Sequence, residues 1–281
     1  MIQFDESKIP PLPAVAARVM QFDPGSPNSS IATLERIIAP DQGISAELLR
    51  VSNSAYYGRS GSIKTLRDAI TLLGLKTVKS MVMLICTRTF TQKIRGDLLR
   101  KYCIEFPIVT ALLCIDNARA ANHKDLQEES FLCGLLHRIG MTMLAVEKKS
   151  EYAELIARAE KEGASLVDLE KDAFGMTHDD INALVIKKWN LPEITVRGIL
   201  DCEFPAEATN KVSHHAKITA LSRTIASQLL DIPRPPAEME RANAVIKAYG
   251  LKADLFSHYT PDYFDLLKEN PFYQSAVAVI G

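Results

Sequence analysis

The chain has 281 residues, 47% of them hydrophobic, which is enough to fill one large core or two small ones. Its 33 Lys and Arg nearly balance 34 Asp and Glu, which argues against a protein that relies on whole-molecule attraction to nucleic acid or anionic lipid. The acidic N-terminus predicts no export signal, and no apolar run approaches the ~20 residues that a bilayer requires. Five cysteines without a Cys-x-x-Cys spacing indicate free thiols, so we expect a soluble cytoplasmic protein with no membrane association.

Apolar residues recur at helical spacing along the chain, whereas alternating strand patterns bounded by turn residues are scarce. The sequence therefore predicts an all-α protein. In chain order, helices are expected over residues 15–22, 31–38, 41–51, 65–73, 75–89, 97–122, 126–146, 151–159, 165–174, 177–189, 192–200, 212–230, 238–249 and 262–268.

Several of these helices carry start and stop residues. Ser30 can cap the second helix, and Gly74 can end the fourth. Pro107 is expected to kink the long helix over residues 97–122 or to begin a new one, because proline lacks a backbone N–H. Thr177 and Asp180 have the spacing of a capping box at the start of a later helix.

Four sequence blocks occur in order along the chain. They are a helix ending in Asn53-Ser54-Ala55-Tyr56-Tyr57-Gly58, a helix corner at Leu73-Gly74-Leu75, the segment Gly134-Leu135-Leu136-His137-Arg138-Ile139-Gly140, and Trp189-Asn190-Leu191-Pro192. Together they resemble the HDOD family, the HD-related output domains of bacterial signalling proteins, which are relatives of the HD metal-dependent phosphohydrolases. The signature positions of this resemblance are Asn53, Tyr57, Gly58, Gly74, Gly134, Trp189 and Pro192.

The resemblance implies a multi-helical HD-like bundle with an additional N-terminal helical subdomain. It places an HDOD domain over residues 1–230, with an N-terminal helical part at about 9–95 and an HD-like part at about 96–230. Residues 231–281 then form an aromatic-rich helical tail, which we expect to pack on the core. The alternative is that the tail presents a contact surface for a partner.

The resemblance also defines the positions of an HD metal site. HD phosphohydrolases hold a divalent metal with a histidine, an adjacent His-Asp pair and a later aspartate, and the metal activates a water molecule. Here Phe106 stands in place of the first histidine, His137-Arg138 in place of the pair, and Ser222 in place of the last aspartate. Of the metal-type ligands, His137 and His178 remain. Because Arg138 replaces a carboxylate with a cation, we predict a vestigial site without metal, other cofactor or catalytic residue.

The remaining histidines also have structural interpretations. His137 is predicted to form a hydrogen bond within a helical core, and His178 belongs to the predicted capping box. Cys133 lies four residues before His137, but no third group orients the pair, so a packed thiol is expected rather than a nucleophile. The alternative for His137 is a cleft in which it binds a small anion together with Arg138.

Residues 60–101 form a basic segment in this nearly neutral chain. Nine Lys or Arg against two Asp give a net charge of +7 by subtraction. Aromatic residues are scarce there, so a solvated helix face or a docking face for an acidic partner is favoured over a nucleic-acid site. The acidic stretch over residues 125–180 is an internal alternative partner. Lys76 and Lys79 are the candidate contacts of this segment.

These observations predict a non-enzymatic regulatory module of bacterial signal transduction. It would bind other signalling proteins or a small anionic ligand through an HD-like fold that lacks the metal ligands. One alternative is a metal-dependent phosphohydrolase acting on a nucleotide, and another is nucleic-acid binding through the basic segment. The sequence leaves a homo-oligomer open.

Overall fold

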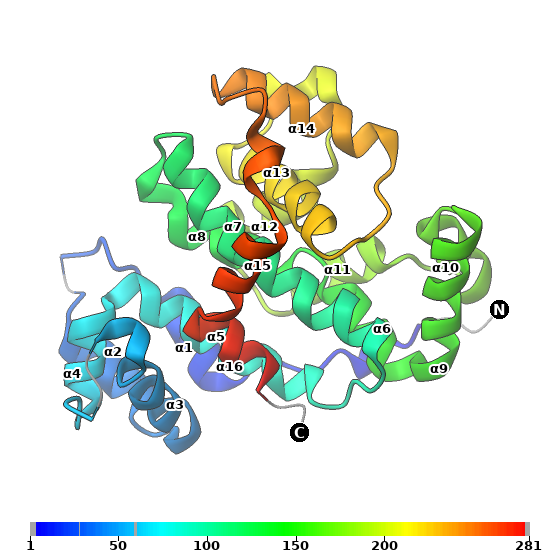
Figure 1. Cartoon of the computed structure of the whole chain (residues 1–281). Coiled ribbons are helices and arrows are strands. Elements are labelled where there is room, and N and C mark those ends of the chain that lie inside the picture. Colours follow the sequence, from blue (N-terminus) through cyan, green and yellow to red (C-terminus); the bar gives the residue numbers. More distant parts are fainter. Residues whose placement is uncertain (1–3, 28, 59–60, 279–281) are drawn as a thin grey trace.

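The computed structural model describes residues 4–27, 29–58 and 61–278, and none of these residues lies in a β-strand. The prediction of an all-α protein is therefore confirmed for the described residues (Figure 1). The N-terminal part contains η1 (Glu6–Lys8), α1 (Ala14–Gln21), α2 (Ile31–Ile38), α3 (Gln42–Ser52), η2 (Ala55–Tyr57), α4 (Leu66–Leu73) and α5 (Leu75–Thr91).

The HD-like part follows. It contains α6 (Asp97–Arg100), η3 (Lys101–Glu105), α7 (Phe106–Ala120), η4 (Lys124–Leu126), α8 (Gln127–Leu136), α9 (Ile139–Glu162), α10 (Leu166–Phe174), α11 (His178–Lys188), α12 (Glu193–Leu200), η5 (Asp201–Glu203), η6 (Ala206–Lys211) and α13 (His214–Leu229). The tail consists of α14 (Pro236–Ala248), η7 (Leu255–His258), α15 (Pro261–Lys268) and α16 (Pro271–Val277).

Local capping explains why many helices begin where the sequence predicts. The Ser30 side chain accepts a hydrogen bond from the backbone N–H of Thr33 at the start of α2. The predicted capping box of α11 is present, because Thr177 and Asp180 each accept a hydrogen bond from the other's backbone N–H. These caps fix helix ends from contacts within a few residues.

The segment over residues 97–122 contains a π-helical stretch, η3, between α6 and α7. Its wider turn places Pro107 near the start of α7, where the N–H that proline lacks is not needed. The carbonyl of Cys103, four residues before Pro107, accepts instead the hydroxyl of Thr142 at 3.5 Å. The tertiary contact thus replaces the hydrogen bond that Pro107 removes.

The tail crosses the face shown in Figure 1, from α14 down to α16 beside α5. Phe272 of α16 packs on Phe131 of α8, with ring centroids 5.0 Å apart. Tyr263 donates a hydrogen bond of 2.6 Å to Asp116, and Tyr259 donates one of 3.2 Å to Asn117. The tail, the N-terminal part and the HD-like part all contribute to one large hydrophobic cluster.

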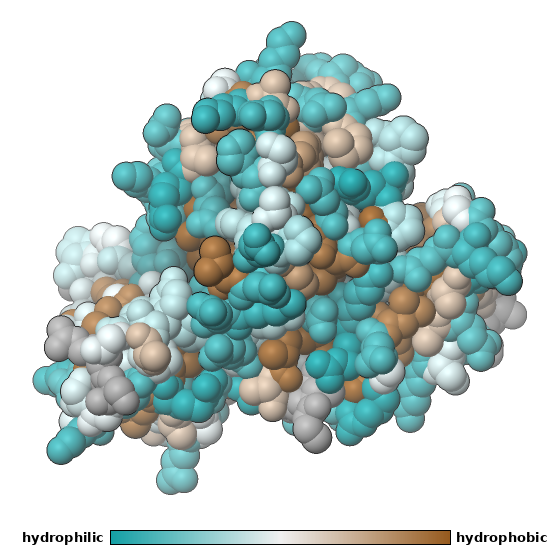
Figure 2. All heavy atoms as spheres, in the orientation of Figure 1, coloured by the Kyte–Doolittle hydropathy of each residue, from teal (hydrophilic) through white to brown (hydrophobic). Residues whose placement is uncertain are grey.

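The surface and the helix lengths bear on membrane association. Figure 2 shows a face covered mostly by hydrophilic residues, with hydrophobic ones in small groups. Among the described residues, no single helix combines the length and hydropathy of a membrane span. The pair α4 and α5 meets that criterion only when the two are joined, and they are bent by 111°.

Candidate functional site

A break between two helices forms the centre of the candidate site. The sequence predicts one helix over residues 126–146, and this prediction is wrong, because α8 ends at Leu136 and α9 begins at Ile139. Arg138 between them has the non-helical backbone angles φ −126° and ψ 32°. The amide of Asn182 in α11 binds both sides of the break. Its nitrogen donates to the carbonyl of His137 at 2.7 Å, and its oxygen accepts the N–H of Gly140 at 2.6 Å.

Two glycines allow neighbouring helices to approach this break closely. A Cβ added at Gly140 would lie 2.0 Å from the carbonyl oxygen of His178, so α11 can reach the start of α9 only if residue 140 has no side chain. A Cβ at Gly134 would lie 2.7 Å from Cα of Ala111 in α7. The spacing Gly134-x-x-His-Arg-x-Gly140 therefore reflects close packing on both sides of the histidine.

His137 is buried and neutral. Its Nδ1 lies 2.7 Å from the carbonyl oxygen of Gly134, which assigns the ring proton to Nδ1. Its Nε2 is buried without a hydrogen-bond partner. Burial, together with the charges of Arg223 and Arg138, holds the pKa of His137 well below its ordinary value of 6.5. Nε2 is therefore a hydrogen-bond acceptor that has no donor among the described residues.

Arg138 lies beside this ring and has no carboxylate partner in the described part of the chain. Its guanidinium carbon is 4.8 Å from the ring centroid of Phe106, and the same ring meets His137 edge-on at 5.3 Å. Its side chain donates a hydrogen bond to the sulfur of Met141 at 3.6 Å, and its Nε has no partner among residues 4–27, 29–58 and 61–278. Phe106, His137 and Arg138 thus come together, and the aromatic ring of Phe106 faces the cation.

Arg223 of α13 supplies a second guanidinium. It forms an ion pair with Glu203, whose other carboxylate oxygen pairs with Arg241 of α14 at 3.0 Å. Burial disfavours the charged form of Glu203, but the two arginines overcome this effect and lower the pKa of Glu203 well below its ordinary range. Nε of Arg223 has no partner although the residue is 5% exposed.

These side chains line a cavity of about 130 Å³. Its polar wall consists of His137, Arg138, Asp179, Asn182, Glu203 and Arg223, and its apolar wall of Ile199, Leu200 and Cys202. We call this cavity the arginine pocket. It collects residues from the break before α9 and from α11, α12, η5 and α13.

Three of the five predicted metal-site positions lie outside the walls of the arginine pocket: Phe106, which contacts His137 and Arg138 from outside, Ser222 and His178. Ser222 is fully buried and accepts a hydrogen bond of 2.9 Å from Asn117, so the pocket wall is formed by the next residue, Arg223. The ring of His178 is turned to Glu170, whose carboxylate lies 2.7 Å from Nδ1. Glu170 also accepts the hydroxyl of Tyr152 at 2.6 Å. His178 is thus tied into a buried network, while its neighbour Asp179 faces the pocket.

Sequence reasoning missed Asn182, Glu203, Arg223 and Glu170 as members of this region. Arg223 directly follows Ser222, a position that the resemblance singled out, so Ser222 could have indicated it. Asn182 and Glu203 have no local motif, and their roles depend on contacts across 45 and 20 residues, respectively.

The arginine pocket does not fit a divalent metal. Among the described residues, no group of three or more His, Cys, Asp or Glu side chains is arranged to hold one. His137 lines this cavity together with two guanidinium groups, which repel a cation. The donor set is that of an anion site.

The signature residues of the N-terminal part organise the turn after α3. The amide of Asn53 accepts the N–H of Ile63 at 3.0 Å and donates to its carbonyl at 2.8 Å, so it closes the loop between α3 and α4. Tyr57 ends η2 and packs against the core, and Gly58 follows with a φ of 61°. Gly74, with a φ of 84°, separates α4 from α5. These residues are structural in this position.

Trp189 and Pro192 organise the other end of α11. The indole N–H of Trp189 donates to the carbonyl of Pro10 at 2.9 Å, and its ring stacks on Phe90 of α5 at 5.5 Å. Pro192 caps the start of α12. These contacts join the N-terminal segment to the HD-like part.

Most cations of the basic segment are engaged within the molecule. Its first residue, Ser60, lies outside the described residues. Lys76 donates to the carbonyl of Asp125 and Lys79 to that of Phe22, each at 3.2 Å. Arg67, Arg88 and Lys101 form ion pairs with Glu35, Glu47 and Glu160. These five cations therefore have partners within the fold, and the contacts of Lys76 and Lys101 reach the predicted acidic stretch.

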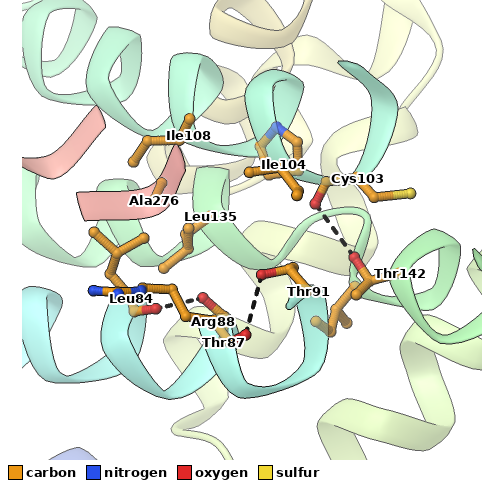
Figure 3. A pocket seen from close by; sticks show the side chains of 12 residues that line it. Leu84, Thr87, Arg88, Thr91, Cys103, Ile104, Ile108, Leu135, Thr142 and Ala276 are labelled. Carbon is orange, nitrogen blue, oxygen red and sulfur yellow. Dashed lines mark hydrogen bonds between the residues drawn. The ribbon is translucent and has the colours of Figure 1, made fainter. Parts of the chain in front are cut away.

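A second cavity lies between α5, η3, α7, α8 and α16 (Figure 3). Its volume is about 20 Å³, and its walls are mainly apolar side chains such as Leu84, Ile104 and Leu135. Figure 3 shows its threonine hydroxyls directed to backbone carbonyls, including that of Thr142 to Cys103. It has room for about one water molecule and is not a candidate ligand site.

The helical architecture and the site at the helix break define an all-α protein of HD-like fold. A family model of the HDOD domain matches residues 9–203. This match covers well over half of the chain, and the chain belongs to the HDOD family. Arg223 and Arg241 lie beyond the matched residues.

Solved structures support the same fold. An HDOD domain protein of unknown function from Geobacter sulfurreducens superposes with a TM-score of 0.74 at 16% identity, covering 95% of this chain and 93% of that one. A candidate phosphohydrolase from Shewanella amazonensis gives 0.69 at 24% identity, with 96% and 95% covered. A candidate signal transduction protein from Marinobacter aquaeolei gives 0.70 at 19% identity, with 100% and 62% covered.

A curated relative, an uncharacterized protein from Treponema pallidum, is 22% identical over 199 residues. The matched stretch covers 68% of this chain and 37% of that protein. The chain therefore spans little more than a third of this relative.

Proposed function

We propose that the protein is a non-enzymatic regulatory module of bacterial signal transduction, in which the arginine pocket is a ligand site and partner proteins receive the response. The observation that carries this proposal is the pairing of Arg138 with Phe106 beside His137, where an HD phosphohydrolase would need metal ligands. A cation and an aromatic ring cannot replace a carboxylate and a histidine in holding a divalent metal. The relation to a candidate signal transduction protein agrees with this role.

The partner surface is proposed to include α12. Leu200 lines the arginine pocket and is 42% exposed, and Ile194 on the same helix is 45% exposed. An apolar residue that touches both the ligand site and the surface gives a partner access to the state of the pocket. Five buried free thiols fit the reducing cytoplasm as the place of action.

The experiment is a metal and turnover measurement on the full chain. We expect purified protein incubated with manganese to retain substoichiometric metal after desalting, and to hydrolyse bis-p-nitrophenyl phosphate no faster than His137→Ala does. Stoichiometric metal with turnover that disappears in His137→Ala would overturn the proposal and restore the alternative of a metal-dependent phosphohydrolase; the name of the Shewanella amazonensis protein describes that relative as a phosphohydrolase.

A further inference from the structure

Three buried nitrogen atoms around the arginine pocket have no hydrogen-bond partner. They are Nε2 of His137, Nε of Arg138 and Nε of Arg223. His137 and Arg223 are 3% and 5% exposed, so bulk water does not satisfy them. Leaving a buried polar atom unpaired is unfavourable, and three such atoms on residues around one cavity indicate a missing polar occupant.

The charge of the pocket selects an anion. The wall residues Arg138 and Arg223 balance Glu203 and Asp179, and Arg241, which pairs with Glu203 from outside the wall, adds one positive charge, which leaves +1 for the cluster by subtraction. Glu203 is already shared between two arginines, and Asp179 is half exposed at the rim. Arg138 has no carboxylate partner among the described residues. A small oxyanion would give it one and would also meet the free Nε of Arg223.

His137 adds a second requirement. Its proton is on Nδ1 and is donated to the carbonyl of Gly134, so the buried Nε2 of this wall residue carries a lone pair. A fully deprotonated oxyanion would place a second acceptor against this lone pair. An oxyanion that keeps an O–H group satisfies His137 as a donor and both arginines as an acceptor.

We propose that the arginine pocket binds a small oxyanion that retains an acidic hydrogen, with inorganic phosphate as its representative. The volume of about 130 Å³ suits an ion of this size with ordered water, and it is smaller than the ~300–1,000 Å³ of pockets for drug-sized ligands. A nucleotide is therefore excluded from full burial there. This inference names the ligand class of the same site and rests on the proposed function.

The test is a calorimetric titration of the full chain without added metal at about pH 8. Inorganic phosphate still carries a hydrogen at that pH, sulfate has none, and a phosphate monoester has lost its second proton, whose pKa is about 6. We expect phosphate to bind at least about tenfold more tightly than sulfate or methyl phosphate, as expected for a lost hydrogen bond to charged groups. The methyl phosphate arm distinguishes the free ion from a phosphorylated side chain.

The variant Arg138→Gln should weaken phosphate binding by about tenfold or more, since it removes the unpaired cation. Arg197→Gln is the matched control, because Arg197 lies on α12 near the pocket but is exposed and paired with Glu193. It should leave the affinity unchanged. If Arg138→Gln does not fold, Arg138→Lys is the second variant, because it keeps the charge and loses the planar fork. Phosphate binding is again expected to weaken.

Absence of phosphate binding, equal affinity for sulfate, or equal weakening by Arg197→Gln would each overturn the inference. None of these results affects the proposed function as long as metal and turnover stay absent in the same sample. Metal-dependent turnover would overturn the proposed function, and phosphate binding that requires manganese would overturn both.

Discussion

The basic segment and the arginine pocket are two cationic regions with opposite character. The segment over residues 60–101 has a net charge of +7, yet Lys76, Lys79, Arg67, Arg88 and Lys101 all donate to acceptors within the fold. The charged wall residues of the pocket balance to zero, and Arg241 beside Glu203 adds only +1, yet three buried nitrogens of the wall residues have no hydrogen-bond partner among the described residues. The difference teaches that unsatisfied donors and acceptors mark a candidate site better than the charge of a stretch does.

The largest effect on stability is expected at Gly140, where the backbone of α9 approaches α11 beside the pocket. Gly140→Ala places a Cβ 2.0 Å from the carbonyl of His178, which must push α11 away from Arg138. We expect a loss of about 3 kcal/mol or more in the free energy of unfolding, measured by urea denaturation. Gly43→Ala, where the nearest atom is 3.4 Å away, should change stability by less than about 1 kcal/mol. Similar values for the two variants would contradict the close approach of α11.

A smaller effect is expected at Glu47, which pairs with Arg88 of the basic segment where α3, α5 and α16 meet. Glu47 of α3 accepts hydrogen bonds from Arg88 of α5 at 2.8 Å and from Ser275 of α16 at 2.5 Å. Glu47→Gln should lower the free energy of unfolding by about 2 kcal/mol, because Arg88 loses its acidic partner. Glu35→Gln, which affects the exposed Arg67, should cost less than about 0.5 kcal/mol. Equal losses would show that Glu47 is no more than a surface contact.

The same carboxylate predicts a pH dependence. Burial disfavours ionised Glu47, but hydrogen bonds from Arg50 and Ser275 and the nearby arginine charges lower its pKa to about 2 from 4.5. A carboxyl with a lowered pKa in the folded state contributes stability above the unfolded value, and this contribution is lost as the pH falls from 4.5 towards 2. The stability difference between wild type and Glu47→Gln should therefore shrink over that window in urea unfolding. A difference independent of pH would rule out the ionised carboxylate as its source.

The smallest effect concerns nucleic acid. If the cations of the basic segment are occupied within the fold, the double variant Lys76→Gln, Lys79→Gln should change binding of a labelled single-stranded DNA by less than about twofold. Its free energy of unfolding should fall by about 1 kcal/mol, because two hydrogen bonds to carbonyls are lost. Fluorescence anisotropy at low and high salt checks this. Tight binding that weakens steeply with salt and is lost in the variant would restore the nucleic-acid alternative.

Much of the fold could be predicted because helix ends depend on nearby residues. Ser30, Gly74 and Thr177 act within one turn of the helices that they begin or end, and the structure places these ends as predicted. The interruption at Arg138 could not be predicted in this way. The run from Phe131 to Gly140 is apolar enough for one helix, and the break depends on Asn182, which lies more than 40 residues later.

The candidate site was predictable only in its centre. His137, Arg138 and Phe106 follow from the resemblance, and the structure brings them together. Glu203 and Arg223 come from η5 and α13, and no sequence spacing indicates that they reach the same cavity. Likewise, the orientation of the His178 ring depends on Glu170, a carboxylate that is fully buried in the fold.

The placement of α11 has a structural consequence. Its first turn carries Asp179 and Asn182 in the pocket wall, and at its other end Lys188 and Trp189 hold the carbonyls of Ile9 and Pro10. Because α11 has eleven residues and rises ~1.5 Å per residue, it is about 16 Å long. One helix therefore joins the pocket wall to the attachment of residues 9 and 10.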